Sequence, residues 1–171
     1  MRCGNGGRFP ICLVEGLGYY ESPLGVYKIT SKGEAITSVE FLREDKIREM
    51  ITPVIRQCMT ELDEYFSKGR KFFTVPLTLE GSVFQNKVWS ALQEIPFGTT
   101  ISYTELSQRI GDGNAIRAVG LANGQNPIAI IVPCHRVIGK DGNLVGYAGG
   151  LDKKEWLLEH EGILSKQFKL F

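Results

Sequence analysis

The residues best suited to chemistry stand together at Cys134, His135 and Arg136. A cysteine that follows an apolar run is usually part of a hydrophobic core. Here an imidazole and a guanidinium follow it directly, and such groups stabilise a neighbouring thiolate, which lowers the thiol pKa from its free value of about 8.5. The pattern therefore predicts that Cys134 is a nucleophile.

A nucleophile of this kind needs a base and a carboxylate that orients the base. In an extended backbone the side chains of Cys134 and His135 point to opposite faces, so direct bonding between them requires a turn or a bridging water. Glu159 and Glu161 lie near the end of a predicted terminal helix, and both are candidates for the carboxylate. The spacing does not choose between them, since either residue could be a solvated acid at a helix end.

The remaining cysteines, Cys3, Cys12 and Cys58, show no C-x-x-C spacing, and the chain has only two histidines, His135 and His160. We therefore expect no metal site, and we expect these cysteines to be free thiols. Cys58 lies on the apolar face of a predicted helix, which favours a core position.

The composition is typical of a soluble globular protein, with 43% hydrophobic and 23% charged residues among 171. No run approaches the roughly 20 apolar residues of a membrane span, and no signal peptide is evident, so we expect a cytoplasmic protein. The net charge of +1 gives no general attraction to nucleic acid. A nucleic-acid partner would have to be held by local contacts.

The N-terminal portion of the chain is predicted to be a small antiparallel sheet followed by a helix. Short β-branched or aromatic runs separated by turn residues predict strands at 19–22, 25–30 and 35–41. Thr52 is the expected N-cap of the helix and Pro53 its first residue, because apolar residues then recur every three or four positions.

A short extended piece at 71–79 follows, and we place a domain boundary there, which gives domains at residues 1–78 and 79–171. The second domain is predicted to be mostly helical. Ser82 and Gln85 form a capping-box pattern at the start of its first helix.

Two short helices come next, one at 100–110 and one running from Asn114, as N-cap, to about Asn123. The glycine-containing turn at 111–113 joins them, and helix, turn, helix is the outline of a DNA-binding unit. Such helix pairs are also common in domains that never meet DNA, so this outline alone is weak evidence.

The segment 127–132 is predicted to be a buried strand or extended run that leads into Cys134. A glycine-punctuated loop at 139–150 and a terminal helix from about Leu151 or Asp152 to His160 complete the chain. Trp156 and Leu157 are expected to face inward. The predicted fold class is α+β.

The stretch 84–162 resembles the C-terminal domain of the O6-alkylguanine-DNA alkyltransferases, also called methylated-DNA–protein-cysteine methyltransferases. The resembling motifs follow the family's order and cover nearly half of the chain: Ile101-Ser102-Tyr103, Arg117-Ala118-Val119-Gly120, Asn126-Pro127, Ile131-Val132-Pro133-Cys134-His135-Arg136-Val137, Gly146-Tyr147-Ala148-Gly149-Gly150, Lys154-Glu155-Trp156-Leu157-Leu158 and His160-Glu161-Gly162. Residues 1–78 resemble the family's ribonuclease-H-like first domain only in outline.

The resemblance implies that Cys134 accepts the alkyl group from O6-alkylguanine, and from O4-alkylthymine, and ends as a stable thioether. The protein would act once and need no cofactor. His135, through a water, and Glu161 would lower the proton affinity of the thiol, and Asn126 would hold the loop geometry. Tyr103 would donate a proton toward the departing base.

The same resemblance implies a monomer that binds double-stranded DNA containing O6-alkylguanine and extrudes the damaged nucleotide. Arg117 would fill the vacated place in the base stack. The residues implied in contacts with DNA or the base are Arg117, Ala118, Val137, Tyr147, Ala148 and Gly149. Ala148 replaces a serine of some relatives and Ala129 a proline, and we expect the smaller Ala129 to admit alkyl groups larger than methyl.

Three other functions compete with this one. Alkyltransferase-like damage sensors share the fold but lack the motif cysteine, and Cys134 argues against that class. A cysteine hydrolase would need an oxyanion hole and turnover. A regulator that senses alkylation of its thiol would need a second domain, for which 171 residues leave no room.

Overall fold

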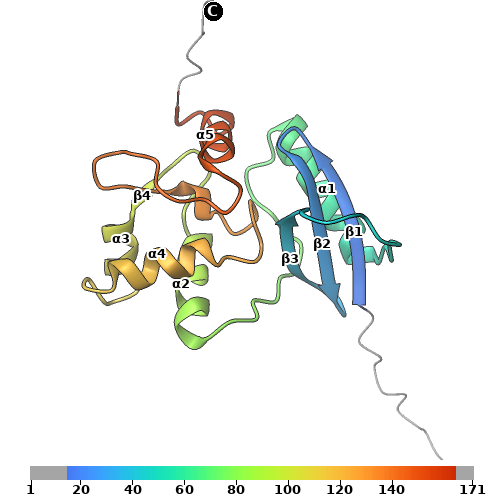
Figure 1. Ribbon diagram of the computed structural model, residues 1–171, viewed down its shortest axis with the longest axis horizontal. Coiled ribbons are helices and arrows are strands. Elements are labelled where there is room, and N and C mark those ends of the chain that lie inside the picture. The colour runs from blue at the N-terminus through green and yellow to red at the C-terminus, as the bar shows by residue number, and fades with distance from the viewer. Residues whose placement is uncertain (1–14, 165–171) are drawn as a thin grey trace, which may run out of the picture.

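A computed structural model describes residues 15–164 of the chain; Cys3 and Cys12 lie outside this range. Two lobes lie side by side in Figure 1, one built on a three-stranded sheet with a long helix and the other built from short helices. None of the helices within the described residues is long and apolar enough to cross a membrane.

The sheet of the first lobe is antiparallel, with the order β1-β2-β3, and its strands are β1 (Glu15–Ser22), β2 (Gly25–Lys32) and β3 (Ala35–Phe41). The three predicted strands are confirmed, although β1 begins four residues before Tyr19. Two-residue turns join the strands, since Ser22 pairs with Gly25 and Lys32 with Ala35. The last strand, β3, is the one that lies nearest to the helical lobe (Figure 1).

Helix α1 (Pro53–Lys68) begins as predicted, because the Thr52 hydroxyl accepts a hydrogen bond from the Ile55 N–H. Gly69 ends it with a φ of 72°, a left-handed conformation that glycine adopts without strain. Cys58 is fully buried on the face of α1 that packs into the core, and this confirms its predicted position. Burial raises the pKa of its thiol to about 12, so Cys58 is an inert core residue.

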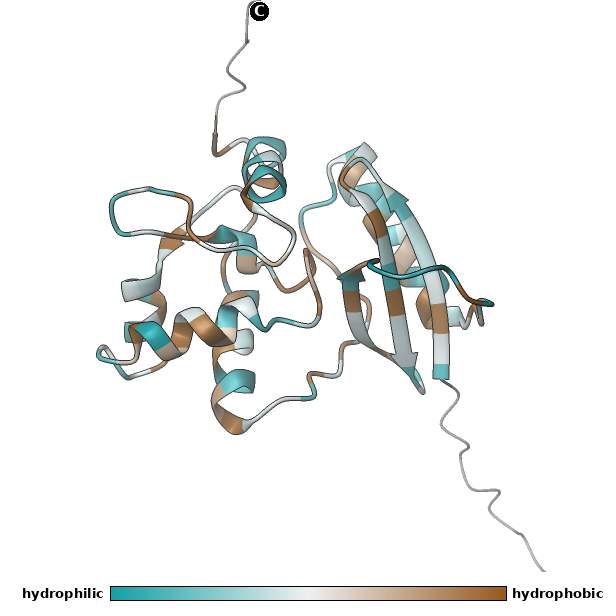
Figure 2. Ribbon diagram, in the orientation of Figure 1, coloured by the Kyte–Doolittle hydropathy of each residue, from teal (hydrophilic) through white to brown (hydrophobic). Residues whose placement is uncertain are grey.

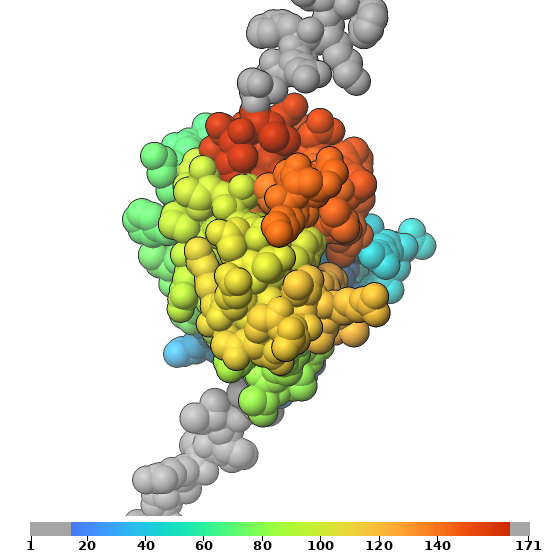
Figure 3. Space-filling view, turned by 90° about the vertical axis from the view of Figure 1, so that its left-hand side faces the viewer, coloured from blue at the N-terminus to red at the C-terminus, as the bar shows by residue number. Residues whose placement is uncertain are grey.

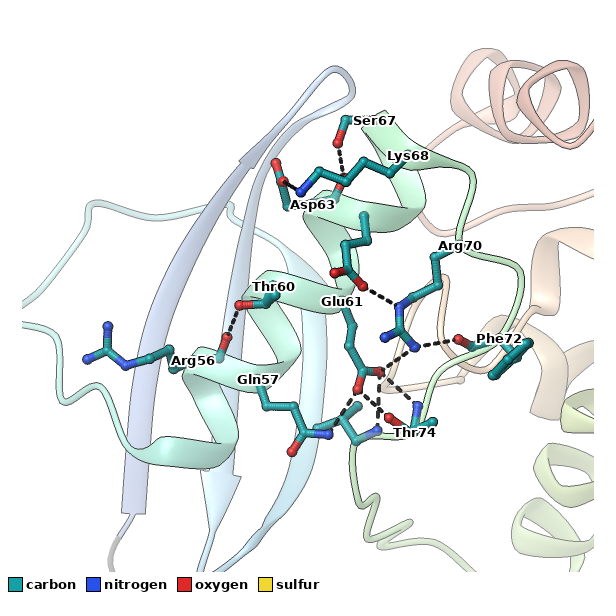
Figure 4. Close-up of polar contacts among 12 residues, drawn as sticks. Arg56, Gln57, Thr60, Glu61, Asp63, Ser67, Lys68, Arg70, Phe72 and Thr74 are labelled. Carbon is teal, nitrogen blue, oxygen red and sulfur yellow. Dashed lines mark hydrogen bonds and ion pairs between the residues drawn. The ribbon is translucent and has the colours of Figure 1, made fainter.

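A buried carboxylate attaches the chain after α1 to the helix itself (Figure 4). Glu61 accepts hydrogen bonds from Gln57 Nε2 at 2.9 Å, Thr74 N at 2.8 Å, Thr74 Oγ1 at 2.6 Å and Val75 N at 3.2 Å. Arg70 Nη1 lies 3.7 Å from the same carboxylate. A buried charge is tolerated when its lone pairs are satisfied in this way, so the segment that connects the lobes has a defined path.

The helical lobe begins with α2 (Val83–Gln93), whose capping box of Ser82 and Gln85 is confirmed. Helix α3 (Tyr103–Arg109) is shorter than the helix expected at 100–110, because Ile101 and Ser102 form strand β4 (Ile101–Ser102) instead. This strand pairs in parallel with β5 (Val137–Ile138).

Helix α4 (Ile116–Gly124) completes the helix-turn-helix outline, but the predicted N-cap was wrong. Ala115 is the N-cap and provides no side-chain hydrogen bond. The N–H of Asn114 instead bonds Asp112 Oδ1 at 3.1 Å, because the aspartate side chain forms a local turn that competes with capping. Much of α4 is hydrophobic (Figure 2), and Ile116 and Leu121 are exposed on it.

The prediction of a strand or extended run at 127–132 was wrong. Only Ile128 pairs, through one bridge to Val39 of β3, after which the chain turns. Ile130 has a φ of 70°, rare for a β-branched residue, and the Ile131 N–H bonds the Ala129 carbonyl at 2.8 Å. The side chains of this run are apolar because the segment is buried. A buried turn needs apolar side chains as much as a buried strand does, so the composition did not distinguish the two.

A single 3-10 turn, η1 (Cys134–Arg136), follows this segment, and α5 (Leu151–His160) ends the lobe. The terminal helix is confirmed: Leu157 is fully buried, and Trp156 is partly buried against the core. One continuous core includes residues of both lobes, from Tyr27 and Ile55 to Val132 and Leu157. The turn that carries Cys134 is thus packed between the lobes.

Candidate active site

Cys134 is 6% exposed and lines a cavity of about 540 Å³ between the two lobes. The helical lobe contributes Asn126, Tyr147 and Ala148 to the lining. The sheet lobe contributes the end of β3 and the residues that follow it, Val39 to Glu44. The predicted nucleophile therefore lies in a site that both lobes build.

Burial raises the pKa of the Cys134 thiol, because a thiolate is poorly solvated there. Hydrogen bonding from Asn126, the positive charge of Lys154 and the backbone N–H groups of Cys134 and His135 act in the opposite direction. The site therefore combines desolvation, which makes a thiolate more reactive, with donors and a cation that make one attainable.

Asn126 holds the turn that leads into Cys134. Its amide Nδ2 donates to the Val132 carbonyl at 2.8 Å and to the Ile128 carbonyl at 3.4 Å, while its Oδ1 accepts from the Ile128 N–H at 3.0 Å. These bonds span the segment with the left-handed Ile130, whose strained backbone needs such support.

His135 lies next to the carboxylate at the end of α5, because η1 turns the backbone and directs this fully buried side chain there. His135 Nε2 lies 2.8 Å from Glu161 Oε1. Burial lowers the pKa of His135, partly opposed by Glu161, so the imidazole is neutral at neutral pH. An ionised Glu161 only accepts hydrogen bonds, so Nε2 carries the proton and Nδ1 is free to act as the base.

Glu161, not Glu159, is the carboxylate at this site. Besides His135, it accepts from Arg136 Nε at 2.8 Å and Nη2 at 2.9 Å, Tyr65 Oη at 2.9 Å and Gly98 N at 3.2 Å. Burial alone would raise the pKa of Glu161, but the His135 and Arg136 bonds lower it to about 2. Glu161 therefore stays ionised throughout the physiological range.

The ammonium of Lys154 is fully buried and ties the loop before α5 to β5. It donates to the carbonyls of Val137 at 2.6 Å, Val145 at 2.8 Å and Gly146 at 3.4 Å. Burial lowers its pKa to about 8, partly opposed by Cys134. Sequence reasoning assigned no role to Lys154, although the residue belongs to one of the motifs that carry the family resemblance.

The remaining predicted residues lie outside the cavity lining. Arg117 and Ala118 are exposed on α4, and neither lines the cavity. The segment that contains α3 and α4 lies at the surface that faces the viewer in Figure 3. Tyr103 Oη donates to the Val145 carbonyl at 3.1 Å. The Val137 side chain is fully buried and does not line the cavity, although its carbonyl is one of the Lys154 acceptors.

No group of three or more histidine, cysteine or acidic residues within residues 15–164 could hold a metal ion. The chemistry available from the described side chains is that of a desolvated thiol with a neutral imidazole and an ionised carboxylate behind it. Such a set can take a proton from the thiol and present sulfur to an electrophile inside a cavity.

Comparison with known families agrees with this arrangement. The model of the 6-O-methylguanine DNA methyltransferase DNA binding domain matches residues 83–163, and the model of the 6-O-methylguanine DNA methyltransferase ribonuclease-like domain matches residues 17–79. The chain belongs to the 6-O-methylguanine DNA methyltransferase family. Family membership confirms the resemblance found in the sequence and the enzyme class, methylated-DNA–protein-cysteine methyltransferase.

Individual relatives are similar over most of their length. The methylated-DNA–protein-cysteine methyltransferase of Methanosarcina acetivorans is 47% identical over 149 residues, which are 84% of this chain and 96% of the relative. That of Haemophilus influenzae is 42% identical over 152 residues, 85% of each chain.

Solved structures show the same α+β fold. The crystal structure of Mycobacterium tuberculosis O6-methylguanine methyltransferase has a TM-score of 0.78 at 40% identity and covers 92% of this chain and 99% of that chain. Mycobacterium tuberculosis OGT in complex with DNA has a TM-score of 0.77 at 44% identity, with 84% and 90% covered. The predicted fold class is confirmed.

Proposed function

We propose that this methyltransferase repairs DNA by moving the alkyl group of O6-alkylguanine, and of O4-alkylthymine, onto the sulfur of Cys134. The bond between O6 and the alkyl carbon breaks as the bond between Sγ and that carbon forms. The thiol proton leaves through His135, and the departing guanine gains a proton, so the overall change is Cys–SH to Cys–S-alkyl and alkylguanine to guanine. A thioether does not hydrolyse, and each molecule therefore reacts once.

The observation that carries this proposal is the buried hydrogen bond between His135, the residue after Cys134, and Glu161. The free Nδ1 of His135 is buried and has no partner among the described residues. A single water between Nδ1 and Sγ would complete the path for the thiol proton. Glu161 at 2.8 Å would stabilise the imidazolium that results.

Proton delivery to the base is assigned to Tyr103, at the start of α3. Burial raises the pKa of Tyr103, and the charge of Cys134 raises it further. The phenol therefore keeps its proton at neutral pH. Such a group can donate a hydrogen bond to a developing negative charge on the purine. Tyr147, Ala148 and Gly149 form the loop that would hold the base, and Asn126 would keep the thiol in line.

DNA is the proposed partner, bound by the face that α3 and α4 share. The exposed Arg117 on α4 would occupy the stack when the nucleotide turns out, and Ala118 would contact the backbone. Extrusion is required, because a sulfur buried in the protein cannot reach the alkyl carbon of a stacked base. Because the net charge of the protein is only +1, its affinity for DNA would depend modestly on salt concentration. The affinity would also depend weakly on the base sequence of the DNA.

Three further proposals accompany this function. The protein acts as a monomer, its location is the cytoplasm, and the chain divides into domains at residues 1–78 and 79–171. The Glu61 contacts with the connecting segment support a boundary close to residue 78, since the chain there leaves one lobe for the other.

Intact mass spectrometry tests the proposal directly. The protein is mixed with a duplex that carries one O6-methylguanine, beside a Cys134→Ser variant with the same duplex and the wild type with an undamaged duplex. We expect the wild type alone, and only with the damaged duplex, to gain the mass of one methyl group. An unmodified wild type, or equal modification of the serine variant, would contradict the function.

A further inference from the structure

Asn123 is a buried polar residue of the cavity that takes no part in the proposed reaction. It lies near the end of α4, is 3% exposed and lines the cavity together with Cys134 and Tyr147. Its side-chain oxygen, Oδ1, is buried and accepts no hydrogen bond from the described residues. A buried acceptor without a donor is costly, so an unpartnered oxygen beside a cavity indicates a ligand that supplies the donor.

The amide of Asn123 is held in one orientation. Its Nδ2 donates to the Cys134 carbonyl at 3.4 Å, and a further hydrogen bond joins the Asn123 side chain to the Tyr103 phenol. A half-turn of the amide would place Oδ1 against the Cys134 carbonyl, where two acceptors would repel each other. The nitrogen therefore stays on the side of Cys134, and the oxygen is left as a free acceptor.

The two lesion bases differ in whether they can supply a donor. Alkylation at O6 leaves N1 of guanine without a hydrogen, so the amino group at C2 is the one N–H donor that remains on this base. Alkylation at O4 likewise leaves N3 of thymine without a hydrogen, and no N–H donor remains. At C2 thymine carries a carbonyl oxygen, which would be a second acceptor facing Oδ1.

We propose that Asn123 determines base specificity, because its Oδ1 accepts a hydrogen bond from the 2-amino group of O6-alkylguanine. This inference rests on the proposed alkyl transfer and adds a specificity-determining residue to it. A site with a polar group placed to bond a substrate rejects an analogue that lacks the partner, since the polar group then stays unpaired. The protein should therefore prefer alkylguanine to alkylthymine when both carry the same alkyl group.

The experiment compares methyl transfer rates from duplexes that carry O6-methylguanine or O6-methylhypoxanthine, which lacks only the 2-amino group. We expect the wild type to react about tenfold faster with the guanine lesion, the effect expected for one hydrogen bond to a buried acceptor. In Asn123→Leu the two rates should agree within about twofold, because the acceptor is gone. The same variant should also narrow the preference for O6-methylguanine over O4-methylthymine.

Asn86→Leu is the matched control. Asn86, on α2, also has a buried Oδ1 without a partner among the described residues, but it does not line the cavity. Its variant should keep the wild-type preference for the guanine lesion. Comparing the ratio of rates between proteins also removes the effect of the 2-amino group on duplex stability, because every protein meets the same duplexes.

Two outcomes would overturn the role of Asn123. Equal wild-type rates for the two purine lesions would mean that the protein does not bond the 2-amino group. An undiminished preference in Asn123→Leu would mean that another acceptor, such as a backbone carbonyl, bonds it. Asn123→Ala is measured as well and should behave like Asn123→Leu, so the comparison stands even if leucine does not fit. Failure of the proposed function looks different, since the wild type would then react with no lesion.

Discussion

At the scale of single residues, Glu161 has the densest set of hydrogen bonds at the site. Its two oxygens accept from His135, Arg136, Tyr65 and Gly98, and the side chain is fully buried. Replacing one partner of such a network leaves the others buried without a charge partner, which costs more than the hydrogen bond itself. The residue should therefore matter for folding and for the reactivity of the thiol alike.

Glu161→Gln should lower the free energy of unfolding near pH 7 by about 3 kcal/mol, the value that corresponds to a carboxyl pKa moved from 4.5 to about 2. The folded pKa is the lower one, so this stability is present above about pH 4.5. It is lost as the pH falls toward 2, and the two proteins should converge there. Urea unfolding at a series of pH values measures the difference.

Glu159→Gln is the matched control for this prediction. Glu159 lies two residues earlier, is partly exposed and makes no side-chain hydrogen bond among the described residues. Its variant should unfold like the wild type at every pH in the series. A Glu161→Gln difference that stayed constant between pH 5 and pH 2 would contradict the assignment of the ionised carboxylate.

At the scale of elements, α5 and the loop before it form one unit through Lys154. Lys154→Met keeps the length of the side chain and removes the ammonium that three carbonyls share. We expect the loop at 139–150 to loosen and methyl transfer to slow by about tenfold or more, because misplaced binding groups cost rate steeply. Hydrogen exchange of the loop and the transfer rate measure this, with the exposed Lys140→Met as control.

Helix α4 gives a second prediction at this scale. Arg117→Ala should slow methyl transfer from a duplex by about tenfold or more, because nothing would fill the stack when the nucleotide leaves it. Labelling of Cys134 by iodoacetamide should stay unchanged, since Arg117 does not line the cavity. Arg56→Ala, an exposed change on α1, should affect neither measurement, and equal duplex rates for all three proteins would refute the role.

At the scale of the whole molecule, the sheet lobe reaches the buried carboxylate of Glu161 through the side chain of Tyr65. Tyr65 of α1 donates to Glu161 at 2.9 Å, and its backbone carbonyl lies 2.8 Å from His160 Nε2. A hydrogen bond to a buried charge contributes more than one between neutral groups. The two lobes should therefore unfold as one cooperative unit.

Tyr65→Phe should lower the free energy of unfolding by about 2 kcal/mol, the size expected for a hydrogen bond to a charged acceptor. Urea unfolding followed separately by tryptophan fluorescence and by circular dichroism would report both the loss of stability and any loss of cooperativity. Tyr20→Phe removes the same atom from a partly buried tyrosine of the same lobe and should change little. Equal stability of the two variants would show that the bond between the lobes contributes nothing.

The sequence by itself determined the elements whose signals are local. Thr52 with Pro53 and the Ser82–Gln85 capping box mark helix starts within a few residues, and alternation with turn residues marks the strands. The motif around Cys134, taken with its neighbours along the chain, was sufficient to identify the enzyme class. The domain boundary and the roles of the individual site residues remain predictions.

Only the tertiary structure decided which groups meet. Glu159 and Glu161 lie two positions apart, roughly 200° around a helix, so only one can face His135, and the packing of α5 chooses it. The turn at 127–132 has the composition of a strand, and it turns because Asn126 and the bridge to Val39 hold it. Phe41 and Tyr65 reach the site from the other lobe, and contacts so distant along the chain have no local signal.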